Sequence, residues 1–291
     1  MGKNDLAVKV MQAMPDKVVN DVIAEAAEIA GFASLAPHAA RVVLPLSGMI
    51  DAFVAETRLQ DRHPLVKFLS YVKSNFSDEG YAKIQRAHLS HENLERMKRK
   101  GHKSLEHKYL DFPYWMRSKF KKGMDLKLQD YAGEAIIDIG AGPGHFGLVA
   151  NYFGCEYWGL EMPLQPWSGT ERHVFDDLTD FFRIKRIIQE VRSRQKMESG
   201  RRYRLLTCLM GNFCAVPTPQ GKTRPWTWSE WTFFLDNLVC DFLLPEHLMY
   251  FNINREHLSE EVKHNLRRLA SEYDEERSIF SFRNLDAARL K

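Results

Sequence analysis

The chain has 291 residues, a length that fits one large domain or two modest ones. Hydrophobic residues make up 44% of it and charged residues 27%, which is typical of a water-soluble globular protein and excludes a disordered or fibrous one. The formal net charge of +3 is too small to indicate a nucleic-acid partner by itself.

The four cysteines form no C-x-x-C pair and have no zinc-like spacing with histidine, so the sequence predicts no metal site. We expect them to be buried apolar thiols in a reducing compartment. They are Cys155, Cys208, Cys214 and Cys240.

The first residues lack the charged-then-apolar layout of a signal peptide. The most apolar region, residues 29–54, is interrupted by Arg41, Asp51 and two prolines before it reaches the ~20 residues that span a bilayer. The sequence therefore predicts no membrane insertion and a cytoplasmic location.

Residues 1–110 read as helices. Asp16 can cap a helix whose apolar residues run from Val18 to Ile29 at helical spacing. Three further apolar stretches follow, at residues 42–54, 65–76 and 81–97. We predict a helical N-terminal region over 1–110 that forms a lid or a substrate wall, followed by a second domain over 111–291.

From about residue 131 short apolar runs alternate with helical patterns, which is typical of β-α-β units and a mainly parallel sheet. We expect strands at 135–139, 156–160, 186–191, 203–210 and 247–253, and an antiparallel edge strand at 278–282. Helices are expected at 146–153, 174–182, 228–242 and 258–269.

A glycine turn follows the first of these strands, in the segment Asp138-Ile139-Gly140-Ala141-Gly142-Pro143-Gly144. In such sheets a nucleotide-like cofactor lies across the carboxyl ends of the strands, where backbone must approach it closely. Glycine permits that approach and can take positive φ. The next helix would direct its free N–H groups toward the ligand.

Glu161 ends the second predicted strand. A carboxylate at this place can accept hydrogen bonds from both ribose hydroxyls of a nucleoside, each contributing ~1.5–3 kcal/mol. The same position serves NAD enzymes, so Glu161 indicates a nucleoside without choosing the cofactor.

The register of the glycines separates two ligand classes. A dinucleotide fingerprint, G-x-G-x-x-G from Gly140, would put its third glycine where His145 stands. The match from Gly142 begins too far from the strand. The alternating form, with Asp138 ahead of Gly140, instead resembles motif I of the class I S-adenosylmethionine-dependent methyltransferases.

Two further segments resemble that family. Leu205–Asn212 is similar to its fourth strand and the following loop, which lines the place where the methyl group meets the acceptor, and Trp228–Leu238 is similar to the next helix. The resemblance covers about residues 112–255. The chain departs from the family in having no aspartate at Tyr203-Arg204-Leu205, and no clear acidic residue after the third strand, where Arg194 and Gln195 stand.

The resemblance implies a Rossmann-like α/β fold: a seven-stranded, mainly parallel sheet with helices on both faces, preceded here by the helical N-terminal region. It implies S-adenosylmethionine as the cofactor and methyl transfer as the activity. The cofactor-binding residues that we expect are Asp138, Gly140, Ala141, Gly142, Gly144, Glu161, Met162 and Leu209.

The acceptor side is less determined by the sequence. His145 and Asn212 are weak candidates for catalysis, and Trp226, Trp228 and Trp231 either wall an acceptor pocket or pack a helix onto the sheet. We expect a small-molecule or saccharide acceptor. A nucleic-acid acceptor stays open, although the Asn/Asp-Pro-Pro-Tyr/Phe loop of exocyclic-amine methylation does not follow the fourth strand.

Two other functions also fit the sequence. One is an NAD-dependent oxidoreductase, and the other is a non-catalytic methyltransferase-like binding module. The oligomeric state is not indicated by the sequence.

Overall fold

The computed structural model describes residues 44–89, 109–164, 172–211, 213–217 and 223–290. The described residues divide into two compact units: those within 1–122 and 165–182, and those within 123–164 and 183–291. The helix expected between Asp16 and Ile29 lies outside the described residues. The domain boundary predicted after residue 110 stays a prediction.

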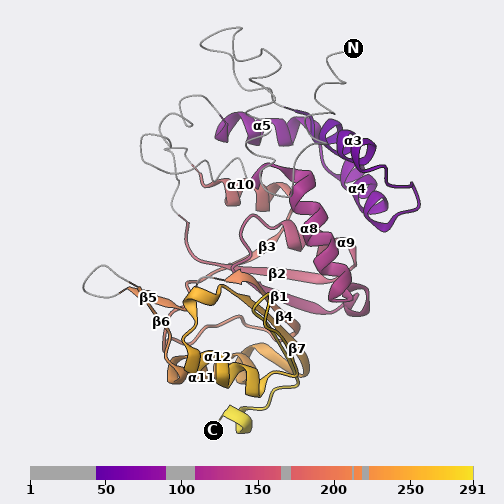
Figure 1. The fold of residues 1–291 in the computed structure, drawn as a ribbon. Helices are drawn as coiled ribbons and strands as arrows, with labels where there is room; N and C mark the ends of the chain where they lie inside the picture. Colours follow the sequence, from indigo (N-terminus) through magenta and orange to yellow (C-terminus); the bar gives the residue numbers. More distant parts are fainter. Residues whose placement is uncertain (1–43, 90–108, 165–171, 212, 218–222, 291) are drawn as a thin grey trace. The chain divides into compact units, whose positions relative to one another are not determined.

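The first unit is helical (Figure 1). Its helices are α3 (Leu46–Thr57), α4 (Pro64–Asn75), α5 (Asp78–His88), most of α8 (Phe112–Asp125) and α10 (Val174–Phe181). The first three are helices at the predicted apolar stretches, of which residues 42, 43 and 90–97 lie outside the described residues. In the core of this unit the buried Tyr81 hydroxyl donates to the carbonyl of Leu110 at 2.8 Å, and the Tyr81 ring meets those of Phe112 and Phe181.

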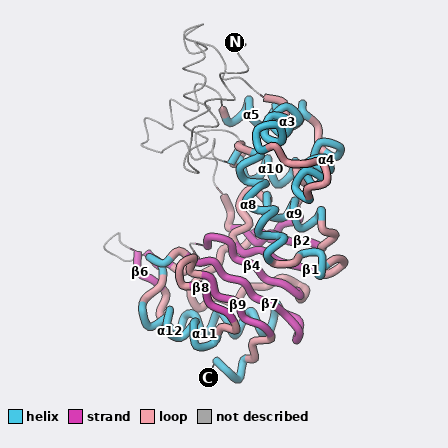
Figure 2. The backbone as a smooth tube through the Cα atoms, turned by 45° about the vertical axis from the view of Figure 1, so that its right-hand side comes forward, coloured by secondary structure: helices cyan, strands magenta, loops and turns pink. Residues whose placement is uncertain are grey.

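The second unit is built on a seven-stranded sheet with the order β3-β2-β1-β4-β7-β9-β8. Figure 2 shows its strands running side by side. The first five strands in this order are parallel, β9 is antiparallel to β7, and β8 is antiparallel to β9. The bounds are β1 (Ala135–Ile139), β2 (Glu156–Glu161), β3 (Lys185–Ile188), β4 (Tyr203–Gly211), β7 (Leu243–Ile253), β8 (Glu272–Asp274) and β9 (Ile279–Arg283). The predicted Rossmann-like fold is confirmed.

Alternate residues of the strands bury against helices on opposite faces of this sheet. Helix α9 (His145–Tyr152) covers one face, where Gly147 allows a close approach: an added Cβ would lie 2.5 Å from the ring of Tyr157. On the other face, the core cluster joins Ile137 and Leu206 of the strands to Leu235 and Leu266 of α11 (Trp228–Asn237) and α12 (Glu260–Leu269). Figure 1 shows α11 and α12 next to each other.

The structure corrects several predicted bounds. The third strand ends at Ile188, not at residue 191. The helix from Trp228 ends as an α-helix at Asn237, and the π-helical turn η3 (Leu238–Phe242) follows it. The segment after residue 278 is an inner strand, because the unpredicted β8 takes the edge. A further unpredicted hairpin joins β5 (Ala215–Pro217) to β6 (Thr223–Pro225).

None of the described helices combines the length and the apolar character needed to cross a membrane. The four cysteines are free; three are buried as expected, whereas Cys240 is exposed.

Candidate cofactor site

The glycine turn has the backbone conformation that its sequence predicts. Gly140, Gly142 and Gly144 have φ of +72°, +57° and +78°, in the left-handed region that glycine favours. The Gly140 amide donates to the carbonyl of Leu160 at 2.8 Å, which fixes the turn against β2. A Cβ added at Gly140 would meet no protein atom within 4 Å, so open space lies beside the turn.

Glu161 is the last residue of β2 and is bonded to this turn. Its Oε2 accepts from the Gly142 amide at 2.7 Å, and its Oε1 accepts from the Met162 amide at 3.1 Å. Glu161 itself is buried, at 8% exposed. These contacts orient the carboxylate, because hydrogen bonds to a charged acceptor are the strong ones.

Asp138 is buried within the sheet, where it links three strands. Its Oδ1 accepts from the Thr207 hydroxyl of β4 at 2.7 Å, and its Oδ2 accepts from the Tyr157 hydroxyl of β2 at 3.1 Å. Burial, together with the Asp138 charge, raises the pKa of Tyr157, so the phenol stays a donor. Asp138 therefore braces the strand end from which the turn leaves.

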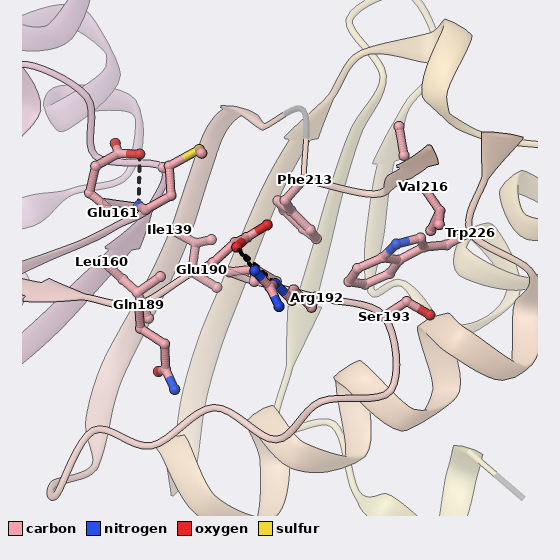
Figure 3. A pocket seen from close by; sticks show the side chains of 14 residues that line it. Ile139, Leu160, Glu161, Gln189, Glu190, Arg192, Ser193, Phe213, Val216 and Trp226 are labelled. Carbon is pink, nitrogen blue, oxygen red and sulfur yellow. Dashed lines mark hydrogen bonds and ion pairs between the residues drawn. The ribbon is translucent and has the colours of Figure 1, made fainter. Parts of the chain in front are cut away.

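A pocket of about 700 Å³ opens at the carboxyl ends of β1, β2 and β3 (Figure 3). Ile139 ends β1, Leu160 and Glu161 end β2, and Gln189 directly follows β3. The full lining is Ile139, Gly140, Leu160, Glu161, Met162, Gln189, Glu190, Val191, Arg192, Ser193, Phe213, Ala215, Val216 and Trp226. This is the edge at which nucleotide cofactors bind in open α/β sheets.

The segment 189–193 is a wall of this pocket that the sequence did not reveal. A third strand predicted over residues 186–191 takes in Glu190, and no clear acidic residue follows that predicted strand. In the structure β3 ends at Ile188, and Glu190 follows it into the pocket lining, ion-paired with Arg192 at 2.5 Å. Arg194 instead donates to the Ser229 hydroxyl and does not line the pocket.

A second wall of the pocket comes from the hairpin after β4 and the residues that flank it. Phe213, Val216 and Trp226 line the pocket, and the Phe213 and Trp226 rings meet edge to face at 5.4 Å. Trp231 is fully buried in the core cluster, so it packs α11 onto the sheet, whereas Trp228 is half-buried. Burial raises the pKa of the Cys214 thiol in this segment to about 12.

The predicted site residues take different places around the pocket. Gly140, Glu161 and the half-exposed Met162 line it. Ala141 packs behind the turn, where a Cβ on Gly159 would lie 2.7 Å from its own. The remaining expected cofactor residues that do not line it are Asp138, Gly142, Gly144 and Leu209.

The two catalytic candidates have different outcomes. His145 is the first residue of α9 and is buried, at 1% exposed, away from the pocket lining. Asn212 lies outside the described residues.

No protein-family model matches the chain, and no curated protein matches its sequence. Solved structures similar to it include S-adenosylmethionine-dependent methyltransferases. One is the S-adenosylmethionine-bound amino pentose methyltransferase CalS10 from Micromonospora echinaspora, at 15% identity, covering 48% of this chain and 51% of that one, with a TM-score of 0.33. Another is an S-adenosylmethionine-dependent methyltransferase from Clostridium acetobutylicum, at 12% identity, covering 55% of this chain and 56% of that one, with a TM-score of 0.33.

A third is the enzyme from Thiobacillus denitrificans in complex with S-adenosylhomocysteine, at 15% identity, covering 46% of this chain and 47% of that one, with a TM-score of 0.30. The chain thus spans about half the length of the structures it matches. The function proposed below rests on the residues of the site.

Proposed function

We propose that this protein binds S-adenosylmethionine in the pocket at the end of β1, β2 and β3 and transfers its methyl group to an acceptor. The observation that carries the proposal is the carboxylate of Glu161. It lines the pocket and is held there by the amide of Gly142. A fixed carboxylate next to a glycine turn suits a ribose, whose two hydroxyls are donors.

The residues of the pocket fit the rest of the cofactor. Its volume, about 700 Å³, lies within the range of small-molecule sites, roughly 300–1,000 Å³. Ile139, Leu160 and Val191 offer apolar surface for a purine ring, and the open space beside Gly140 leaves room for a ligand at the turn. When bound, the sulfonium supplies an electrophilic methyl group, and the chain's own residues bind and align it.

The NAD alternative fits the structure less well. In the standard dinucleotide-binding order 3-2-1-4-5-6 the sheet continues with a parallel strand. Here the position beyond β7 is taken by the antiparallel β9. At the third position of the dinucleotide fingerprint His145 begins α9 and is buried.

For the acceptor we propose a small molecule or a saccharide, with the aromatic hairpin wall of Phe213 and Trp226 nearest to it. A nucleic-acid acceptor is the second candidate class. If the protein is instead a binding module, it will bind the cofactor and yet methylate no member of a broad acceptor library. A cytoplasmic location and the role of residues 1–110 as a lid or a substrate wall belong to the same proposal.

Calorimetric titration of the protein with S-adenosylmethionine and with NAD tests the cofactor. We expect binding of the methyl donor and none of NAD; the reverse result would exclude a methyltransferase. Glu161→Ala should weaken donor binding about tenfold or more, because it removes charged hydrogen bonds to the ribose.

The matched control is Glu156→Ala, at the first residue of the same strand. Glu156 is paired with Arg201 at 2.7 Å through both guanidinium nitrogens and does not line the pocket. Donor affinity should not change in this variant. An unchanged affinity in Glu161→Ala would remove Glu161 from the site.

A further inference from the structure

Glu230 is a buried carboxylate that is bonded to the pocket residue Ser193 and is not itself part of the pocket lining. It is the third residue of α11 and only 4% exposed. A buried carboxylate is costly unless it is paired and hydrogen-bonded, so its partners indicate what holds it there.

Three segments converge on this one carboxylate. Arg224 of β6 donates through Nη1 to Oε2 at 2.7 Å and through Nη2 to Oε1 at 2.8 Å. The amide of Thr227, which caps α11, donates to Oε2 at 2.7 Å. The hydroxyl of Ser193, from the segment after β3, donates to Oε1.

Two of these segments contribute different parts of the pocket lining. Ser193 lines the pocket together with Val191 and Arg192, and Trp226 lines it from the hairpin (Figure 3). Trp226 stands between Arg224 and Thr227 in the chain, and both of those residues are bonded to Glu230. The carboxylate thus connects the wall that follows β3 to the hairpin wall.

We infer that Glu230 is a positioning residue that fixes the separation of the two pocket walls and thereby sets the affinity for the methyl donor. This inference rests on the proposed function. Three contacts of different origin on one carboxylate form a rigid junction, since a bidentate arginine pair constrains direction as well as distance. Loss of the junction lets the segment 189–193 and the hairpin move apart.

Glu230→Gln is the variant that tests this with the least damage to the helix. Glutamine also satisfies a capping box, so α11 keeps its N-terminal cap, but it can no longer make the charged bidentate pair with Arg224. Arg224 is 44% exposed and stays solvated, so the variant leaves no buried cation. We expect the dissociation constant for S-adenosylmethionine to rise about tenfold.

The control is Glu156→Gln. It breaks a bidentate Glu156–Arg201 pair of the same length in the same unit, on residues that are not part of the pocket lining. If Glu230 acted only through stability, both variants would leave donor affinity unchanged. Ser193→Ala, which removes only the contact to the wall after β3, should raise the dissociation constant in the same direction by a smaller factor.

Hydrogen exchange separates this inference from the proposed function, because it needs no ligand. In Glu230→Gln we expect faster amide exchange in both 189–193 and 223–227, and unchanged exchange in the segment around Glu156. Unchanged exchange at 189–193 would overturn the positioning role, even if the wild type bound no donor. Equal donor affinity in wild type and Glu230→Gln would also overturn it, while leaving the proposed function standing.

Discussion

Gly140 and Gly200 form a matched pair for testing the site at the scale of one methyl group. Their φ values are +72° and +67°, and a Cβ at either would meet no protein atom within 4 Å. An alanine at either should therefore cost a similar ~1–2 kcal/mol of unfolding free energy, from backbone strain alone. They differ in that Gly140 lines the pocket.

We therefore expect Gly140→Ala to weaken S-adenosylmethionine binding about tenfold, since the alanine side chain would occupy the open space beside the turn that the ligand needs. Gly200→Ala should bind the donor like the wild type. Calorimetry gives the affinities, and urea denaturation shows whether the stability losses match. Equal affinity in the two variants would place the cofactor away from the turn.

The residues that the sequence predicted well are those whose roles depend on local backbone. The three glycines could be assigned because positive φ is a property of the residue and its turn. Partners across strands could not be predicted. That Asp138 accepts from Thr207 and Tyr157 depends on the register of β1 against β4 and β2, which no local pattern contains.

At the scale of elements, the Asn237 side chain at the end of α11 is hydrogen-bonded to the backbone of the segment before β4. It is buried, accepts from the Met197 amide at 2.9 Å and donates to the Met197 carbonyl at 3.4 Å. Asn237→Ala leaves these buried backbone groups without their partner, which should cost about 1–3 kcal/mol of unfolding free energy in urea denaturation.

The comparison variant for that experiment is Ser271→Ala. The Ser271 side chain also accepts from a backbone amide, that of Arg283 at 3.0 Å, but it is exposed, so water can replace it. Its loss should cost less than half as much. Similar costs for the two variants would mean that burial of Asn237 is not what makes its contacts matter.

Element bounds were predictable where an apolar pattern was long, and not where packing decides them. Strand β1 has the bounds that were expected, whereas β5, β6 and β8 are each three residues long and give no periodic signal. The run Arg186–Val191 is apolar enough to continue a strand, but pairing with β2 ends at Ile188. Because of this difference, the sequence did not predict that Glu190 and its neighbours line the pocket.

At the scale of the whole molecule, the sequence predicted the type of sheet but not its order. Alternating strands and helices indicate a parallel sheet. Strand β9 lies between β7 and β8 because the β8–β9 hairpin pairs with β7 through its second strand. This long-range pairing buries Phe280 and Phe282 and cannot be predicted from a local pattern. The four-residue β3 and three-residue β8 are the two edges of that sheet.

Two buried groups of the helical unit, His173 and Asp111, change its stability with pH in opposite directions. Burial lowers the pKa of His173 to about 4; His88 lowers it further, and Asp176 and Asp177 raise it by less than burial lowers it. The unfolded chain binds this proton first as pH falls below about 6.5, so His173 removes stability between pH 6.5 and pH 4. Burial raises the pKa of Asp111 to about 6, so its contribution is present at low pH and is lost as pH rises through 6.

Substitutions of the two groups should therefore change the slope of unfolding free energy against pH in opposite directions. His173→Asn keeps an acceptor for the Phe175 amide at the N-cap of α10, and its unfolding free energy should rise relative to wild type as pH falls from 7 to 4, by about 2 kcal/mol. The unfolding free energy of Asp111→Asn should fall relative to wild type as pH falls from 7 to 4, because the variant lacks the carboxyl group that stabilises the wild type at low pH. Urea denaturation at half-unit steps of pH measures both slopes. A variant whose unfolding free energy stays parallel to that of the wild type over this range would show that its group titrates in the folded protein as it does in the unfolded chain.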